Sequence, residues 1–213
     1  MAMNRVARTP LGRRHRAAGA GLLALACLCG GAVPAVAHDE HHDHGATAAA
    51  ATTLARRVQE VRLPDVQVQQ QDGSKLRFAQ QLAGDAPVVL NFIYTSCTAI
   101  CPPMTQILAH TQHKLGERAP QVRMVSVSLD PENDTAARLA EYAGRFAAGA
   151  QWRFLTGTQA TSDAIQRAFG VYSPDRMSHT PTTFVRAKGA SLWVRIDGFA
   201  TPDMLIKEAL GGF

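Results

Sequence analysis

The sequence predicts an α/β fold, in which helices flank a mixed central β-sheet. From residue 61 onward, short apolar runs of strand length alternate with segments of helical length. Two strand-like runs near the end predict a closing hairpin, which adds antiparallel strands to the sheet. The chain has 213 residues, enough for one such domain with additional segments.

The first 37 residues predict an export signal. Five arginines precede an apolar stretch that begins near Ala20, and the segment ends in Ala35-Val36-Ala37. A basic head, an apolar middle and an A-x-A ending are the three parts of a secretory signal peptide. The apolar stretch is shorter than the roughly 20 residues of a membrane-spanning helix, which favours cleavage over a retained N-terminal anchor. We therefore expect a periplasmic protein, with a tether to the inner membrane as the alternative.

The distribution of charge argues against nucleic acid as a partner. The formal net charge is +5, but five of the 22 basic residues and no acidic residue lie in residues 1–37. The other 17 basic residues are balanced by the 17 acidic residues of the chain. A nucleic-acid-binding domain needs an excess of basic residues in its folded part, and this chain has none there.

Residues 38–60 are expected to form a flexible linker, and residues 61–213 the folded domain. The linker is rich in histidine, alanine and threonine, a composition that cannot bury a core. Its histidines offer a loose site for a divalent metal ion, and an equally favoured alternative is a solvated tail. These histidines are His38, His41, His42 and His44.

The predicted strands are apolar or alternating runs bounded by turn signals. Alternation on both sides of Asp72-Gly73 predicts an N-terminal hairpin. The continuous apolar run from Pro87 to Tyr94 is typical of a buried central strand, and Asp130-Pro131 ends a second such run. The predicted strands cover residues 66–68, 76–78, 87–94, 122–129, 152–155, 182–186 and 192–196.

The predicted helices begin at prolines or capping residues. Pro102 and Pro103 suit a first helical turn, where a missing N–H costs little. Asp134 or Thr135 is expected to cap the next helix. The predicted helices cover residues 102–115, 134 or 135 to 146, 162 or 163 to 169, and 202–210.

Cys97 and Cys101 are the candidate functional residues. The other two cysteines lie in the export segment, so these are the thiols of the folded domain. A disulfide between them would close a very small loop and add little stability, which favours redox chemistry or metal binding over a structural role. The pair lies between a predicted central strand and a helix, where the helix dipole lowers the pKa of a thiol. Two thiolates prefer Cu(I) and leave a zinc site incomplete.

Three features of the sequence resemble the Sco (SenC) family. The run from Phe92 through Cys97 and Cys101 to Pro102 is similar to the metal-binding loop of that family. Residues 125–135 resemble its second signature, a strand that ends in Asp-Pro before a capped helix. The third feature is a histidine before the closing hairpin, which is His179 here. The resemblance covers residues 61–210 and implies a thioredoxin-like fold.

This resemblance implies a copper metallochaperone. It implies one copper ion, Cu(I) or Cu(II), bound by Cys97, Cys101 and His179. The implied partner is the copper-bearing subunit of cytochrome c oxidase or another periplasmic copper carrier. Two thiolates and one imidazole suit Cu(I), and the imidazole also suits Cu(II).

A thiol–disulfide oxidoreductase is the alternative, and whether the protein is an enzyme is left open. In that function Cys97 would be the nucleophile and Cys101 would resolve the mixed disulfide, keeping the copper-ligand cysteines of a partner reduced. Pro181 resembles the cis-proline of the thioredoxin family and favours this hypothesis. Ser178 replaces an acidic residue that family members often carry before the histidine. A core position is expected for Met104, and solvated positions for His110 and His113.

Overall fold

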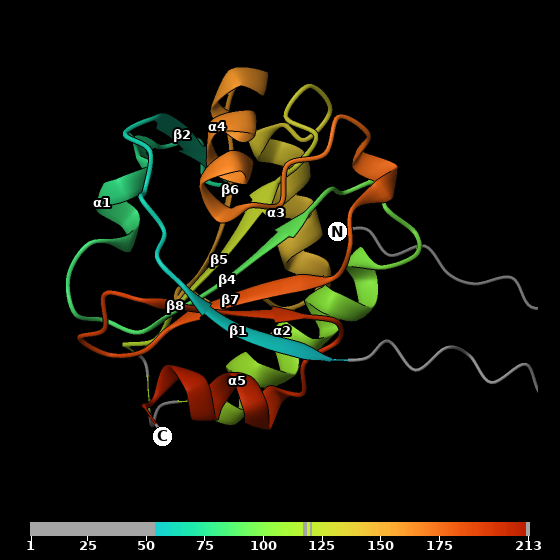
Figure 1. Ribbon diagram of the computed structural model, residues 1–213. Coiled ribbons are helices and arrows are strands. Elements are labelled where there is room, and N and C mark those ends of the chain that lie inside the picture. Colours follow the sequence, from blue (N-terminus) through green and yellow to red (C-terminus); the bar gives the residue numbers. More distant parts are fainter. Residues whose placement is uncertain (1–53, 117–118, 120, 212–213) are drawn as a thin grey trace, which may run out of the picture. The chain divides into compact units, whose positions relative to one another are not determined.

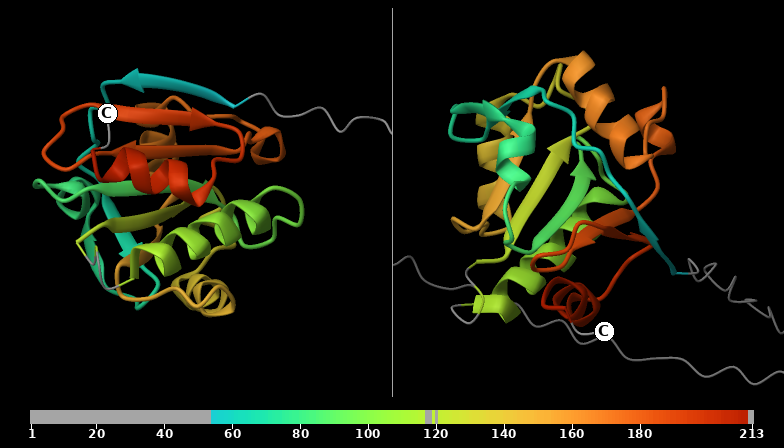
Figure 2. Two further views of the ribbon diagram at one scale, coloured as in Figure 1. Left: turned by 90° about the horizontal axis from the view of Figure 1, so that it is seen from below. Right: turned by 60° about the vertical axis from the view of Figure 1, so that its left-hand side comes forward.

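A mixed β-sheet with helices on both faces forms the domain (Figures 1 and 2). The computed structural model describes residues 54–116, 119 and 121–211. Eight strands of this part form one sheet in the order β1-β8-β7-β4-β5-β6-β2-β3. The strands are β1 (Ala55–Gln59), β2 (Gln67–Gln70), β3 (Lys75–Arg77), β4 (Val88–Ile93), β5 (Arg123–Ser128), β6 (Trp152–Thr156), β7 (Thr182–Arg186) and β8 (Trp193–Asp197). The helices are α1 (Phe78–Leu82), α2 (Cys101–Leu115), α3 (Ala136–Arg145), α4 (Gln159–Phe169), α5 (Pro202–Ala209) and the 3-10 helix η2 (Arg176–Ser178).

The predicted export segment lies outside the described residues, as do the four linker histidines. Among residues 54–116, 119 and 121–211, no helix is long and apolar enough to span a membrane. The choice between a cleaved signal and a retained anchor stays a prediction.

The centre of the sheet determines where the thiols lie. Strand β4 is buried along its whole length, and it pairs with β5 in parallel and with β7 in antiparallel orientation. Strand β6 pairs with β5 in parallel, so the carboxyl ends of β4, β5 and β6 lie at the same edge of the sheet. The chain leaves β4 at this edge and enters α2 through the loop that contains Cys97. The carboxyl edge of an open α/β sheet is where such folds place their binding sites.

Aromatic side chains pack on both faces of the sheet. Phe169 of α4 packs edge-on against Phe92 of β4 and Phe184 of β7, with ring centroids 5.8 and 4.8 Å apart. On the opposite face, Tyr142 of α3 packs against Phe154 of β6 at 6.0 Å. Edge-on pairs of this kind contribute about 1 kcal/mol each beyond the burial of their apolar area. Helices therefore pack against both faces of the sheet, and the α/β fold with a mixed sheet is confirmed.

Strand β1 differs from the prediction, because residues 55–59 were expected to belong to the linker. The strand pairs with β8 in antiparallel orientation at the edge of the sheet, and most of its residues are exposed. Arg56 and Arg57 form ion pairs with Glu208 and Asp197, at 2.6 and 2.9 Å. An edge strand held by backbone pairing and surface charges has no alternating apolar pattern, so its sequence is typical of a linker.

The prediction also lacks α1 and η2 and starts α4 too late, while the other elements agree to within a few residues. Phe78 was expected in a strand, but it is the first residue of α1. Helix α4 begins at Gln159 rather than at Ser162 or Asp163. The side chain of Thr158 caps this helix by accepting a hydrogen bond from the Thr161 N–H at 3.1 Å.

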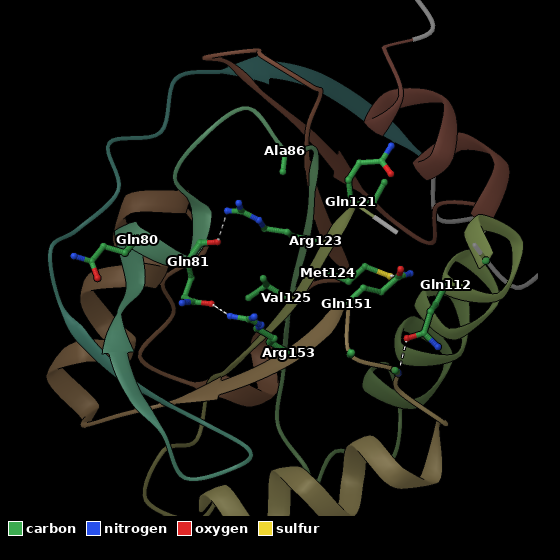
Figure 3. A pocket seen from close by; sticks show the side chains of 14 residues that line it. Gln80, Gln81, Ala86, Gln112, Gln121, Arg123, Met124, Val125, Gln151 and Arg153 are labelled. Atoms are coloured by element: carbon green, nitrogen blue, oxygen red, sulfur yellow. Dashed lines mark hydrogen bonds between the residues drawn. The ribbon is translucent and has the colours of Figure 1, made fainter. Parts of the chain in front are cut away.

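An open pocket of about 860 Å³, lined by glutamine, arginine and apolar residues, lies at the amino edge of the parallel strands, opposite the thiol loop (Figure 3). Arg123 of β5 donates hydrogen bonds to the carbonyl oxygens of Gln81 and Ala83, at 3.0 and 2.6 Å. Arg153 of β6 donates to the side-chain oxygen of Gln81. Both arginines are thus engaged with α1 and the residues after it, and the predicted site residues line another part of the molecule.

Candidate functional site

The loop between β4 and α2 brings the two cysteines together beneath an exposed surface. Cys97 and Cys101 are free thiols, with relative exposures of 7% and 1%. The Cys97 N–H donates to the Tyr94 carbonyl at 3.1 Å, which turns the chain directly after β4. Ser96, Thr98 and Ala99 cover this turn and are exposed. The loop therefore shields the thiols while its own residues Ser96, Thr98 and Ala99 face solvent.

The amino end of α2 directs one N–H group at the sulfur of Cys97. Cys101 is the first residue of the helix, and its N–H lies 3.3 Å from the Cys97 Sγ. Pro102 and Pro103 have no N–H, and the Met104 N–H bonds back to the Ile100 carbonyl at 3.2 Å. Because a helix start carries unpaired N–H groups and partial positive charge, this arrangement stabilises a thiolate at Cys97.

The two thiols differ in acidity. Burial by itself raises the pKa of Cys97, but hydrogen bonds from the side chain and backbone of Cys101 outweigh it and lower that pKa below its ordinary value of 9.0. Burial is the largest cause that raises the pKa of Cys101, and its hydrogen bond to Cys97 is the next largest. The pair therefore loses its first proton from Cys97 and retains the second on Cys101.

The hydroxyl groups of Thr105 and Tyr142 support the backbone at Cys101. The Thr105 hydroxyl donates to the Cys101 carbonyl at 2.8 Å and lies 2.8 Å from the hydroxyl of Tyr142. Tyr142 belongs to α3, so this contact ties the first turn of α2 to a second helix. Burial raises the pKa of Tyr142 to about 12, which keeps its hydroxyl protonated near neutral pH.

A buried carboxylate fixes the start of the loop. Asp134 is fully buried and accepts hydrogen bonds from the Thr95 N–H at 3.1 Å and the Thr95 hydroxyl at 2.6 Å. It also accepts from the Ser128 hydroxyl at 2.6 Å, at the end of β5. The expected choice of helix cap resolves to Thr135, whose Oγ1 accepts from the Arg138 N–H at 3.3 Å. Asp134 instead joins the carboxyl ends of two neighbouring parallel strands.

His179 lies beside the strand that leads to the thiols. It follows η2 directly and is partly buried. Burial lowers the pKa of its imidazole to about 4, and the backbone of Phe92 in β4 acts in the opposite direction. A neutral imidazole has a free nitrogen lone pair, which is the form that binds a metal ion.

The segment that carries His179 lies against the thiol loop, although it does not complete a metal site there. Figures 1 and 2 show η2 beside the loop between β4 and α2. The Tyr94 hydroxyl donates to the Met177 Sδ at 3.2 Å, and Arg176 forms an ion pair with Asp130 at 3.4 Å. Within the described part of the chain, no three His, Cys, Asp or Glu side chains form a group that could hold a metal ion. The structure thus pairs Cys97 with Cys101 and leaves His179 outside that pair.

The other residues considered from the sequence have simpler positions. Met104 is buried in the core, as expected. His110 contacts Gln106 at 3.0 Å on the exposed side of α2, and His113 is also exposed, so their predicted solvated positions are confirmed. Pro181 precedes β7 directly, and its carbonyl accepts a hydrogen bond from the Gly198 N–H at 2.8 Å.

Sequence comparison relates the chain to one family. The SCO1/SenC family model matches residues 64–209. The SCO1 protein homolog of Bacillus subtilis (strain 168) is 39% identical over 90 residues, which is 42% of this chain. That match spans about half of the relative, 46% of its length.

Comparison with solved structures supports the fold. BsSco, described as a member of the Sco family of cytochrome c oxidase assembly proteins with a disulfide switch, aligns with a TM-score of 0.60. The two are 24% identical, over 72% of this chain and 94% of BsSco. Copper-bound ScoI of Bradyrhizobium japonicum aligns with a TM-score of 0.54 at 23% identity, over 65% of this chain and 91% of ScoI. The thioredoxin-like fold expected from the sequence is thereby confirmed.

We predict that Asp134→Ala lowers the free energy of unfolding by about 2–4 kcal/mol, because it leaves buried hydroxyl and N–H donors without their acceptor. Denaturant unfolding at neutral pH measures this loss. Glu132→Gln is the matched control, since Glu132 is an exposed acidic residue in the same loop. Equal stability of the Asp134→Ala variant and the control would contradict a supporting role for Asp134.

We also predict that iodoacetamide labels Cys97 faster than Cys101 in the reduced, copper-free protein. The pKa of Cys97 is lowered and that of Cys101 is raised, so the thiolate is concentrated on Cys97. The rate at each cysteine is followed against pH by peptide mass spectrometry, and the midpoint for Cys97 should lie below 9.0. Cys101→Ala should move this midpoint upward because it removes a hydrogen bond. Equal rates at both cysteines would refute the asymmetry.

A third prediction concerns the stability of the protein at low pH. The imidazole of His179 titrates at about 4 in the folded protein and near 6.5 in the unfolded chain, so the unfolded state binds the extra proton between these values. The free energy of unfolding should therefore fall by roughly 3 kcal/mol through His179 as the pH drops across this window. Denaturant unfolding of the wild type and His179→Ala, compared at each pH, isolates this contribution. Parallel stability profiles for the two proteins would show that His179 does not contribute.

Proposed function

Because this chain belongs to the SCO1/SenC family, we propose that it carries one copper ion on Cys97, Cys101 and His179 and passes it to a partner protein. One observation carries the proposal: the start of α2 and the loop before it bring two free thiols together, with the N–H of Cys101 3.3 Å from the sulfur of Cys97. Soft thiolate ligands favour Cu(I). Because the fold already brings these two ligands together, they can bind the same ion with little loss of backbone freedom.

Copper loading uses the different acidities of the two thiols. Cys97 has the lowered pKa and supplies the first thiolate, while Cys101 still carries its proton. Copper must displace this second proton, which passes to solvent as the Cu–S bond forms. Free thiols are required throughout, since a disulfide has no thiolate to offer.

His179 supplies the third ligand. Its imidazole is neutral above about pH 4, so no proton has to leave before it binds copper. The residue lies at the end of η2, outside the thiol pair, and binding therefore requires this segment to move toward the loop. An imidazole is a good ligand for both oxidation states of copper, whereas thiolates favour Cu(I).

Delivery proceeds by ligand exchange at the exposed face of the loop. Ser96, Thr98 and Ala99 form the surface that a partner meets first. Cys97 is the more acidic thiol and the less buried one, so its bond to copper is the first to yield to an incoming thiolate. We propose the copper-bearing subunit of cytochrome c oxidase as the recipient, with another periplasmic copper carrier as the alternative. The description of BsSco as a cytochrome c oxidase assembly protein supports this choice.

We predict that both cysteines and His179 are needed for tight copper binding. Cys97→Ser and Cys101→Ser should each lower Cu(I) affinity by about a hundredfold or more, and His179→Ala by about tenfold. Anaerobic competition against a chromophoric Cu(I) chelator measures these changes. His110→Ala is the matched control, because this exposed histidine lies on α2 away from the loop. The double variant Cys97→Ser/Cys101→Ser gives the baseline from the other cysteines and histidines of the chain.

Two results would contradict this proposal. Unchanged copper affinity in His179→Ala would remove the third ligand from the model. Weak copper binding combined with rapid reduction of a protein disulfide by the copper-free protein would instead support a thiol–disulfide oxidoreductase.

A further inference from the structure

Met177 places a thioether at the thiol loop, on the same short segment as His179. Its side chain is 74% exposed, the largest exposure among the large apolar side chains of the described residues. The Sδ atom accepts a hydrogen bond from the Tyr94 hydroxyl at 3.2 Å. Hydrophobic packing alone does not account for an apolar side chain in this position, because most of its surface faces water. A polar contact to its sulfur holds the side chain beside the loop.

Tyr94 connects this thioether to the thiol pair. The residue is only 5% exposed, and its carbonyl accepts the Cys97 N–H at 3.1 Å. Its hydroxyl also acts on Cys97 through hydrogen bonding. The hydroxyl donates to the sulfur of Met177 and also influences Cys97, so the Tyr94 side chain connects Met177 to the proposed copper ligands.

Hydrogen bonds within the segment hold the backbone around Met177 in its local conformation, and rotation of the side chain can carry the sulfur to other positions. The Asp175 carboxylate accepts hydrogen bonds from the Met177 N–H and from the Ser178 hydroxyl, both at 2.9 Å. Arg176 adds the ion pair with Asp130 at 3.4 Å. A methionine side chain has three rotatable bonds and no branch, so its sulfur can sweep a wide arc from a fixed backbone.

We propose that Met177 is a further ligand for Cu(I), an inference that rests on the proposed copper-carrying function. The hydrogen bond from Tyr94 to Sδ breaks, and a Cu–S bond forms between the thioether and Cu(I) held by Cys97 and Cys101. No electron or proton is transferred, and the released Tyr94 hydroxyl becomes free to donate to the Cys97 sulfur. A thioether is a soft, uncharged donor that favours Cu(I), whereas the imidazole of His179 also suits Cu(II). The segment that carries Met177 and His179 thus offers one ligand that favours Cu(I) and one ligand that suits both Cu(I) and Cu(II).

The test compares Met177→Leu with Met204→Leu in the full, reduced chain. Leucine keeps the apolar volume but removes the sulfur, and Met204 is a partly buried methionine on α5 that serves as the control. We expect Met177→Leu to lower Cu(I) affinity by about tenfold and to leave Cu(II) affinity unchanged. X-ray absorption of the Cu(I)-loaded protein should show one sulfur ligand fewer. Met204→Leu should behave like the wild type in each measurement.

The outcomes separate this inference from the proposed function. If Met177→Leu keeps the wild-type Cu(I) affinity and sulfur count while Cys97→Ser/Cys101→Ser loses Cu(I), the thioether is not a ligand and only this inference fails. An equal loss of Cu(I) and Cu(II) affinity in Met177→Leu would also overturn it, because a structural effect does not discriminate between oxidation states. If the double cysteine variant binds Cu(I) as tightly as the wild type, the proposed function itself fails.

Discussion

The buried carboxylate of Asp134 is the constraint on which the thiol loop depends. It accepts hydrogen bonds from Thr95 and Ser128, at the ends of two adjacent parallel strands. A buried carboxylate is costly unless it is fully hydrogen-bonded, so neither residue can move away without a large loss of stability. The loop is therefore anchored at Thr95, two residues after the end of β4 and two residues before Cys97. The position of the first thiol follows from this anchor and from the turn between Tyr94 and Cys97.

The start of α2 fixes the position of Cys101 and gives its thiol a different acidity from that of Cys97. Cys101 is held by the first turn of α2 and by the hydroxyl of Thr105, and it is buried more deeply than Cys97. The two prolines that follow it leave the Cys101 N–H as the donor that faces the Cys97 sulfur. Deeper burial raises the pKa of Cys101, and hydrogen bonds from its side chain and N–H lower the pKa of Cys97, so two identical side chains differ in acidity.

Local signals in the sequence were sufficient for the fold and for the cysteine pair. Strand β4 lies in an apolar run, and α2 has prolines in its first turn and a glycine directly after its last residue, so both could be predicted. Strand β1 could not, because an exposed edge strand lacks an apolar pattern. The contacts of Asp134 with Thr95 and of Met177 with Tyr94 join residues 39 and 83 positions apart. Such contacts depend on the tertiary arrangement and leave no local pattern in the sequence.

The proposed ligands divide into a fixed group and a movable one, and the proposed copper transfer uses both. Cys97 lies in the loop after β4 and Cys101 begins α2, and both thiols are buried. His179 and Met177 lie on a short segment whose side-chain contacts with the thiol loop region include one ion pair and one hydrogen bond to sulfur. Each of these contacts has one exposed partner, Arg176 or Met177, which water can reach when the contact breaks. A carrier built this way can hold copper on its rigid thiols and open the remaining coordination positions to a partner without disturbing its core.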